Sequence, residues 1–247
     1  MTEDDETAWG MVRWSNDAWL RPWESGDPMH GPGLTFNQWL AAQRRGERQG
    51  HGIVLLIEHR MRIVGQISIG AISYGSMRTG VVGYWVAQSS AGHGIAPTAL
   101  AMLADWAMAD PDGPRLHRLE IAILPENARS HAVVRKVGAR YEGQRRNYMY
   151  VNGRWRTHDT YSLLAEDRGE GFTAGLVARL ASQSDHSSQP DSQSQSDRPS
   201  SAATAPAGAI SDVQAGAASD AGHAAQTNDA ADTRGTDAAN VMPVSYS

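Results

Sequence analysis

The feature that most constrains the fold is the stretch TGVVGYWVAQSSAGHGIAPTAL, residues 79–100. It begins as a short apolar run typical of a buried strand and ends as a helix, which we expect over about 95–108. Between the two stand Gly92 and Gly94. A helix start after such a turn offers unpaired backbone N–H groups and the positive end of the helix dipole to an anion. The stretch therefore predicts an α/β domain with a phosphate site, although a Gly-x-Gly before a helix also serves as a plain turn.

The residues around this stretch alternate between helix and strand patterns. Thr35 and Gln38 form a capping box that begins a helix. The runs 52–58 and 63–73 read as two strands of a hairpin, and 79–87 reads as a third strand. We expect an N-terminal helix before Thr35. The order up to the glycines is therefore helix, helix and three strands.

The part that follows adds a strand over 117–124 and a helix with Asn127 at its N-cap and Gly138 just past its end. Two last strands flank Asn152-Gly153, a dipeptide strongly associated with tight hairpins. These patterns predict a mixed, mostly antiparallel sheet flanked by helices.

Composition divides the chain of 247 residues into two parts. Near Ser182 it changes to Ser, Ala, Asp, Gln and Thr, with Tyr246 as the only aromatic residue beyond. Such a segment cannot bury enough apolar surface to offset the entropy of ordering. We expect a folded domain over 1–183 and a disordered tail over 184–247.

Charge and composition exclude several classes of function. The net charge is −5, but eight Asp and two Arg lie from residue 185 onward, so the body carries 20 basic and 19 acidic residues. A neutral body does not favour nucleic-acid binding. The absence of cysteine excludes disulfides and thiolate nucleophiles, and we expect no metal. With no signal peptide and no long apolar run, we expect a cytoplasmic protein that does not bind membranes.

The chain resembles the GNAT acetyltransferase superfamily, in particular its RimJ/RimL-type protein N-terminal acetyltransferases. The motifs that carry the resemblance keep one order over about 9–168. They are LRPWE, GQISIGAI, GYWV, GHGIAPTAL, HRLEI, PENARS, KVGARYEG and NGRWRTHDTYSLLAED. The resemblance implies the GNAT fold, acetyl-CoA as the co-substrate and a primary amine as the acceptor. The acceptor that it implies is the N-terminal α-amine of a protein, such as an N-terminal alanine of a ribosomal protein.

The resemblance also implies where acetyl-CoA binds. The strand over 79–87 is expected to splay from the strand over 117–124, so that the pantetheine arm lies beside it. The expected cofactor-binding residues are Trp85, Val86, Ala87, Gly92, His93, Gly94, Ile95, Ala96, Asn127 and Ser130. Trp19, Trp23 and Tyr84 are expected to contact the acceptor.

The reaction needs a neutral amine, a donor for the developing oxyanion and an acid for the departing thiolate. The resemblance suggests Ser130 as that acid, while a purely structural bond in the first turn of its helix is the alternative. Some RimL-like proteins carry a glutamate where this chain has Met149. Glu120 is the substitute base, or else a carboxylate paired with Arg118 or another strand neighbour.

Other bases and other functions stay open at this point. Glu142, His117 and His158 are further candidates for the base. Relatives begin with a strand before the first helix, so either the chain starts further upstream or it lacks that edge strand. The alternatives to an N-terminal acetyltransferase are an enzyme for an aminoglycoside or polyamine, and a non-catalytic acetyl-CoA-binding protein.

Overall fold

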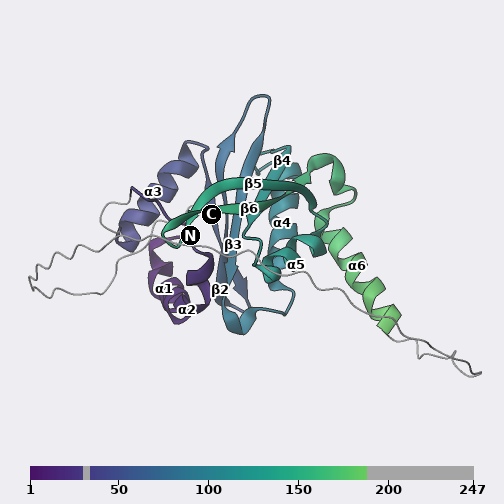
Figure 1. Cartoon of the computed structure of the whole chain (residues 1–247), viewed down its shortest axis with the longest axis horizontal. Helices are drawn as coiled ribbons and strands as arrows, with labels where there is room; N and C mark the ends of the chain where they lie inside the picture. Colours follow the sequence, from purple (N-terminus) through teal and green to yellow (C-terminus); the bar gives the residue numbers. More distant parts are fainter. Residues whose placement is uncertain (30–33, 188–247) are drawn as a thin grey trace, which may run out of the picture. The chain divides into compact units, whose positions relative to one another are not determined.

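The structure, a computed structural model, describes residues 1–29 and 34–187, and in this part of the chain six strands form one sheet (Figure 1). The strands are β1 (Ile53–His59), β2 (Arg62–Ser73), β3 (Thr79–Val86), β4 (Arg118–Ile123), β5 (Arg140–Val151) and β6 (Arg154–Leu164). The helices are α1 (Glu6–Ser15), α2 (Asp17–Leu20), α3 (Phe36–Arg48), α4 (Ile95–Ala109), α5 (Ala128–Val137) and α6 (Phe172–Ser187). Short 3₁₀ turns lie at Glu3–Asp5, Arg21–Trp23, Gln88–Ser90 and Ala165–Arg168.

The local sequence signals correspond to the boundaries of these elements. The Thr35 side chain accepts a hydrogen bond from the Gln38 N–H at the start of α3. The Asn127 side chain caps α5 in the same way, and Gly138 ends that helix with φ 93°. Asn152 and Gly153 both have positive φ, as a tight hairpin between β5 and β6 requires. The predicted mixed α/β sheet is confirmed.

Helices cover both faces of the sheet. Side chains alternate between the faces along each strand, and both faces carry apolar residues that the helices bury. Leu55 of β1 faces the core beneath α4, α5 and α6, where Leu100 and Leu119 have no exposed surface. Val54 and Leu56 face the other side, against Trp9 and Trp39 from α1 and α3. The glycine loop before α4 therefore lies on one side of β3, and the tryptophan-rich segment lies on the other.

The sheet order is β1-β2-β3-β4-β6-β5, and β3 with β4 is its parallel pair. This pairing covers three positions, from Thr79 opposite Arg118 to Val81 opposite Glu120. Beyond Val81 the two strands diverge, so the expected splay is confirmed. A strand that leaves its neighbour exposes backbone groups that a ligand can bond.

Two features at the ends of the domain bear on the predictions. Among the described residues, β1 is the edge strand and no strand lies beyond it. α6 was not predicted, and it continues to Ser187, past the expected boundary at 183. The remainder of the expected tail, 188–247, lies outside the described residues.

Candidate active site

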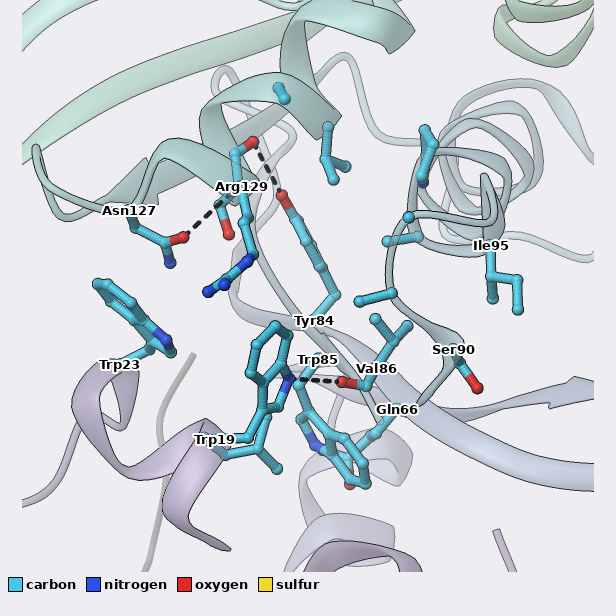
Figure 2. A pocket seen from close by; sticks show the side chains of 18 of the residues that line it. Trp19, Trp23, Gln66, Tyr84, Trp85, Val86, Ser90, Ile95, Asn127 and Arg129 are labelled. Atoms are coloured by element: carbon cyan, nitrogen blue, oxygen red, sulfur yellow. Dashed lines mark hydrogen bonds between the residues drawn. The ribbon is translucent and has the colours of Figure 1, made fainter. Parts of the chain in front are cut away.

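A cavity of about 500 Å³ lies along the end of β3, past the last residue that pairs with β4 (Figure 2). One end is formed by the glycine loop and the first turn of α4. The middle is formed by the end of β3 and the first turn of α5. The other end is walled by the tryptophans of the N-terminal region, which are Trp9, Trp19, Trp23 and Trp39. The cavity suits an elongated ligand with an anionic group at the loop end.

The glycine loop has the geometry of an anion site. Gly92 and Gly94 have φ values of 82° and 79°, which are left-handed conformations that favour glycine. A Cβ atom on either residue would meet no other protein atom within 4 Å, so the space in front of the loop is open. Gly94 is the N-cap of α4, and the N–H groups of Ile95 and Ala96 belong to its first turn.

The end of β3 supplies the middle of the cavity, and two of its backbone groups already have partners. The Trp19 indole Nε1 donates a hydrogen bond of 3.1 Å to the Val86 carbonyl oxygen (Figure 2). A carbonyl has a second lone pair, so Val86 can still accept from a ligand. The Ala87 N–H donates to the Val64 carbonyl oxygen at 2.8 Å and is not free for a ligand.

Three polar side chains meet in the cavity at the start of α5: Asn127 and Ser130 come from that start, and Tyr84 comes from β3. The Asn127 Oδ1 accepts from the Ser130 N–H at 3.2 Å, which fixes the first turn. The Tyr84 hydroxyl donates to the Ser130 carbonyl oxygen at 3.4 Å. Burial raises the pKa of Tyr84, and a hydrogen-bond interaction with the Ser130 side chain opposes that rise. Tyr84 therefore remains a neutral phenol that can donate a hydrogen bond.

The cavity brings together most of the predicted binding residues. Those that line it are Trp85, Val86, Gly92, Gly94, Ile95, Ala96, Asn127, Ser130, Trp19, Trp23 and Tyr84. Two predicted cofactor-binding residues do not line it. Ala87 is turned into the sheet and bonded to Val64, and His93 is exposed outside the cavity.

Glu120 requires a correction, because it lines neither this cavity nor the smaller one beside it. Its carboxylate accepts from Arg118 Nε at 2.9 Å and lies 2.7 Å from an Arg145 guanidinium nitrogen. Arg118 also pairs with Glu142, and this pair holds the pKa of Glu142 below its usual range. The ion-pair alternative therefore fits Glu120 and the general-base assignment does not. Glu142 also belongs to this network.

Several charged residues of the cavity were missed because they come from separate elements. Arg13 of α1 pairs with Glu24 in the tryptophan-walled end. Arg129 lies over the Trp19 ring, with its guanidinium carbon 4.2 Å from the ring centroid (Figure 2). Lys136 lies about two turns further along α5, on the same face as Arg129. The position of Arg129 between the cap Asn127 and Ser130 is the signal that could have revealed it.

A second cavity of about 100 Å³ adjoins the first. The two share the residues Trp23, Ser25, Tyr84, Asn127 and Ser130. Met149, which stands where some relatives were expected to carry a glutamate, lines the smaller cavity, and so does His158. His117 lines neither cavity, because it pairs with Glu166 at 2.7 Å.

Two kinds of feature are absent from residues 1–29 and 34–187. No group of three or more His, Asp or Glu side chains there is arranged to hold a metal ion. No helix in that part of the chain has the length and apolar character that crossing a membrane demands.

Comparison with known proteins gives matches in sequence and in structure. A family model described as an acetyltransferase (GNAT) domain matches residues 1–140. The structure of Mycobacterium smegmatis RimJ in complex with CoA-disulfide is 34% identical, with a TM-score of 0.65. That match covers 73% of this chain and 87% of RimJ.

Two curated relatives match over shorter or less similar stretches. The probable N-acetyltransferase YjcK of Bacillus subtilis is 31% identical over 106 residues, which is 43% of this chain and 57% of that protein. The chain thus spans a little over half the length of YjcK. The [ribosomal protein uS5]-alanine N-acetyltransferase of Escherichia coli is 24% identical over 168 residues, 66% of this chain and 85% of that enzyme.

Proposed function

Because the chain belongs to the acetyltransferase (GNAT) domain family, we propose that this N-acetyltransferase transfers the acetyl group of acetyl-CoA to the N-terminal α-amine of a protein. An N-terminal alanine of a ribosomal protein is the proposed acceptor, as in the E. coli relative. The observation that carries the proposal is the continuous cavity from the glycine loop, past the end of β3, to the tryptophan wall. It provides an anion site and an acceptor site on either side of the α5 start.

The residues present fit acetyl-CoA. The open space before Gly92 and Gly94 leaves room for the pyrophosphate against the start of α4. Lys136 and Arg129 line the same cavity and can balance phosphate charge. The pantetheine arm would lie beside Trp85 and Val86, where β3 has left β4. RimJ, which shares this fold at 34% identity, was solved with a CoA derivative.

Acetyl-CoA supplies the activated acetyl thioester, and the protein holds and polarises the reacting groups. Asn127 and Ser130 are placed at the junction of the two cavities, where the thioester and the amine would meet. Ser130 is proposed as the acid that protonates the departing thiolate. Attack by the amine nitrogen forms the amide C–N bond as the C–S bond breaks, so no covalent bond to the enzyme is needed.

The charges of the cavity favour an α-amine over a polycation. Among the described residues, Glu24 is the only carboxylate that lines it, and Glu24 pairs with Arg13, while Arg129 and Lys136 are both cations. A polyamine or aminoglycoside needs carboxylates for its several positive charges. An α-amine has a pKa of about 8, against about 10.4 for a lysine side chain. The cationic lining therefore favours an acceptor that is readily neutral.

The test is CoA release by the full chain with acetyl-CoA and a panel of acceptors. The panel contains peptides that begin with Ala, Ser or Met, an Nα-blocked lysine peptide, and spermidine. Mass spectrometry of the product locates the acetyl group. Turnover confined to free α-amines, with Ala preferred, is expected. Turnover of spermidine or of the blocked lysine peptide alone would contradict the proposal.

A further inference from the structure

The smaller cavity extends the active site into the gap between the splayed strands. Val81, Val82 and Gly83 of β3 and Ile121 to Ile123 of β4 form its walls. The last paired residue of β4 is Ile123, opposite Asp159 of β6. His158 precedes Asp159 and lies just beyond the end of β4, at the far wall of this gap.

Among the described residues, His158 is the only one lining the smaller cavity that carries an imidazole. The other ionisable lining residue is Tyr84, and burial raises its pKa. Met149 also lines the cavity and has no proton to exchange. Ser25, Asn127 and Ser130 supply polar groups but cannot act as bases at physiological pH.

The hydrogen bond of His158 fixes which ring nitrogen is free. Its Nδ1 lies 3.0 Å from the Arg156 carbonyl oxygen. A carbonyl only accepts, so Nδ1 carries the hydrogen and Nε2 of the neutral ring keeps its lone pair. Among the described residues, the buried side-chain atoms without a partner are Thr79 Oγ1, His131 Nε2 and Asp167 Oδ2. His158 Nε2 is not one of them and has no hydrogen-bond partner among the described residues, so it keeps accessible surface, and His158 lines the smaller cavity.

The surroundings keep His158 neutral. The residue is 3% exposed, and burial lowers its pKa, while the hydrogen bond to the Arg156 carbonyl opposes that shift. The charge of Arg156 also lowers the pKa, and those of Glu126 and Asp159 raise it. Further titratable groups face the ring: Arg145 is the cross-strand partner of His158 on β5, the centroid of the Tyr148 ring lies 6.1 Å from that of His158, and Tyr84 lines the same cavity.

We propose that His158 Nε2 is the general base, which takes the proton of the acceptor amine through water held in the smaller cavity. This inference rests on the proposed function. A water molecule needs about 10–15 Å³ of such volume and two or more polar partners, so the cavity has room for a relay. The shared residues Asn127 and Ser130 place one end of that relay at the reacting amine.

The proton balance closes within the site. The amine nitrogen bonds to the thioester carbon, the C–S bond breaks, and the proton lost by nitrogen passes through water to Nε2. Ser130 protonates the thiolate and regains its proton from the imidazolium through the same water. The ring returns to its neutral form, and no other reactant is consumed.

The experiment compares variants at His158 and Met149 in the full chain, with the best peptide of the acceptor panel. His158→Gln is expected to lower kcat/KM about 100-fold at pH 7, within the range for loss of a general base. The deficit is expected to shrink toward pH 9, because hydroxide in the solvent then takes the proton that the amine nitrogen loses, in place of the imidazole. Acetyl-CoA affinity is expected to stay unchanged.

Rescue separates a chemical role from a structural one. Adding Met149→Glu to His158→Gln places a carboxylate on the wall of the same cavity and is expected to restore kcat/KM at least tenfold. Met149→Gln in that background has a similar shape without a base and is expected to restore nothing. His117→Gln, at an exposed histidine that lines neither cavity, is the matched control and is expected to match the unaltered protein.

Two results would overturn the assignment. One is a His158→Gln variant within threefold of the unaltered protein at pH 7. The other is a loss of kcat/KM in His158→Gln that stays constant from pH 7 to pH 9, together with equal kcat/KM values when Met149→Glu or Met149→Gln is added. The unaltered protein is assayed first, on all amines of the panel. An acceptor other than an α-amine would contradict the proposed acceptor alone, and the variants would then be compared on that amine.

Discussion

Replacing Glu120 by glutamine is expected to lower the stability of the domain and to leave turnover nearly unchanged. The carboxylate is 16% exposed and accepts from Arg118 and Arg145, whose side chains are 23% and 37% exposed. Glutamine keeps one acceptor oxygen but turns an NH2 group toward the second arginine. Hydrogen bonds to charged groups contribute about 1.5–3 kcal/mol. Because water screens both arginines, we expect a loss of about 1–2 kcal/mol.

That loss is measurable in a domain of this size. A change of 1 kcal/mol shifts the melting temperature by about 2–4 °C, so Glu120→Gln is expected to lower it by about 2–8 °C. Urea unfolding gives the free energy directly, and kcat/KM is measured on the same preparation. Glu126→Gln is the matched control, because Glu126 pairs with Arg156 while 51% exposed. A surface pair of this kind contributes about 0–1 kcal/mol.

The reasoning about Glu120 has a clear refutation. A drop in kcat/KM of about 100-fold at unchanged stability is the size that loss of a general base produces. Such a result would mean that the carboxylate leaves its two arginines during the reaction and reaches the amine. It would also remove the reason to look for the base at His158.

Three further outcomes are expected. Ser130→Ala is expected to lower kcat about 10- to 100-fold, measured by turnover. Acetyl-CoA affinity, measured by calorimetry, is expected to stay unchanged, because the Asn127 cap bonds the backbone N–H of residue 130 and is kept in the variant. Trp19→Phe raises KM for the peptide about five- to tenfold with little change in kcat, because it removes the indole bond to Val86 and weakens the Arg129 contact. Arg118 holds the pKa of Glu142 below its usual range, so the stability this pair contributes is complete above about pH 5 and is lost as the pH falls below about 4. Urea midpoints at pH 6 and pH 3 measure that loss.

The sequence predicted those parts of the fold whose signals are local. A capping box needs only Thr35 and Gln38, and a tight hairpin needs only Asn152 and Gly153. The glycine loop also followed from neighbouring residues, since its left-handed backbone and the start of α4 adjoin in the chain. These elements could be predicted because the residues that stabilise them lie within a few positions.

Helix α6 could not be predicted in this way, because its cap comes from another helix. Asp105 of α4 accepts from the N–H groups of Phe172 and Thr173, at 2.8 and 2.9 Å, and from Arg168. Burial raises the pKa of Asp105, but these hydrogen bonds outweigh it and leave the pKa below its usual range. Asp105 is 67 positions from Phe172 in the sequence, so the residues near Phe172 give no local signal for the start of the helix.

The sequence could not decide between Glu120 and His158 as the general base for the same reason, because the contacts that decide it come from residues far apart in the sequence. Both lie on strands beside the cleft, and sequence alone gave the carboxylate the stronger claim. Which side chain reaches the gap depends on where β3 leaves β4, and that point is the pair of Val81 with Glu120. Glu120 is still inside the paired region, where Arg118 of the same strand and Arg145 of β5 reach it. His158 lies beyond the last pair of β4 and borders the open gap, so the register of the sheet selects the histidine.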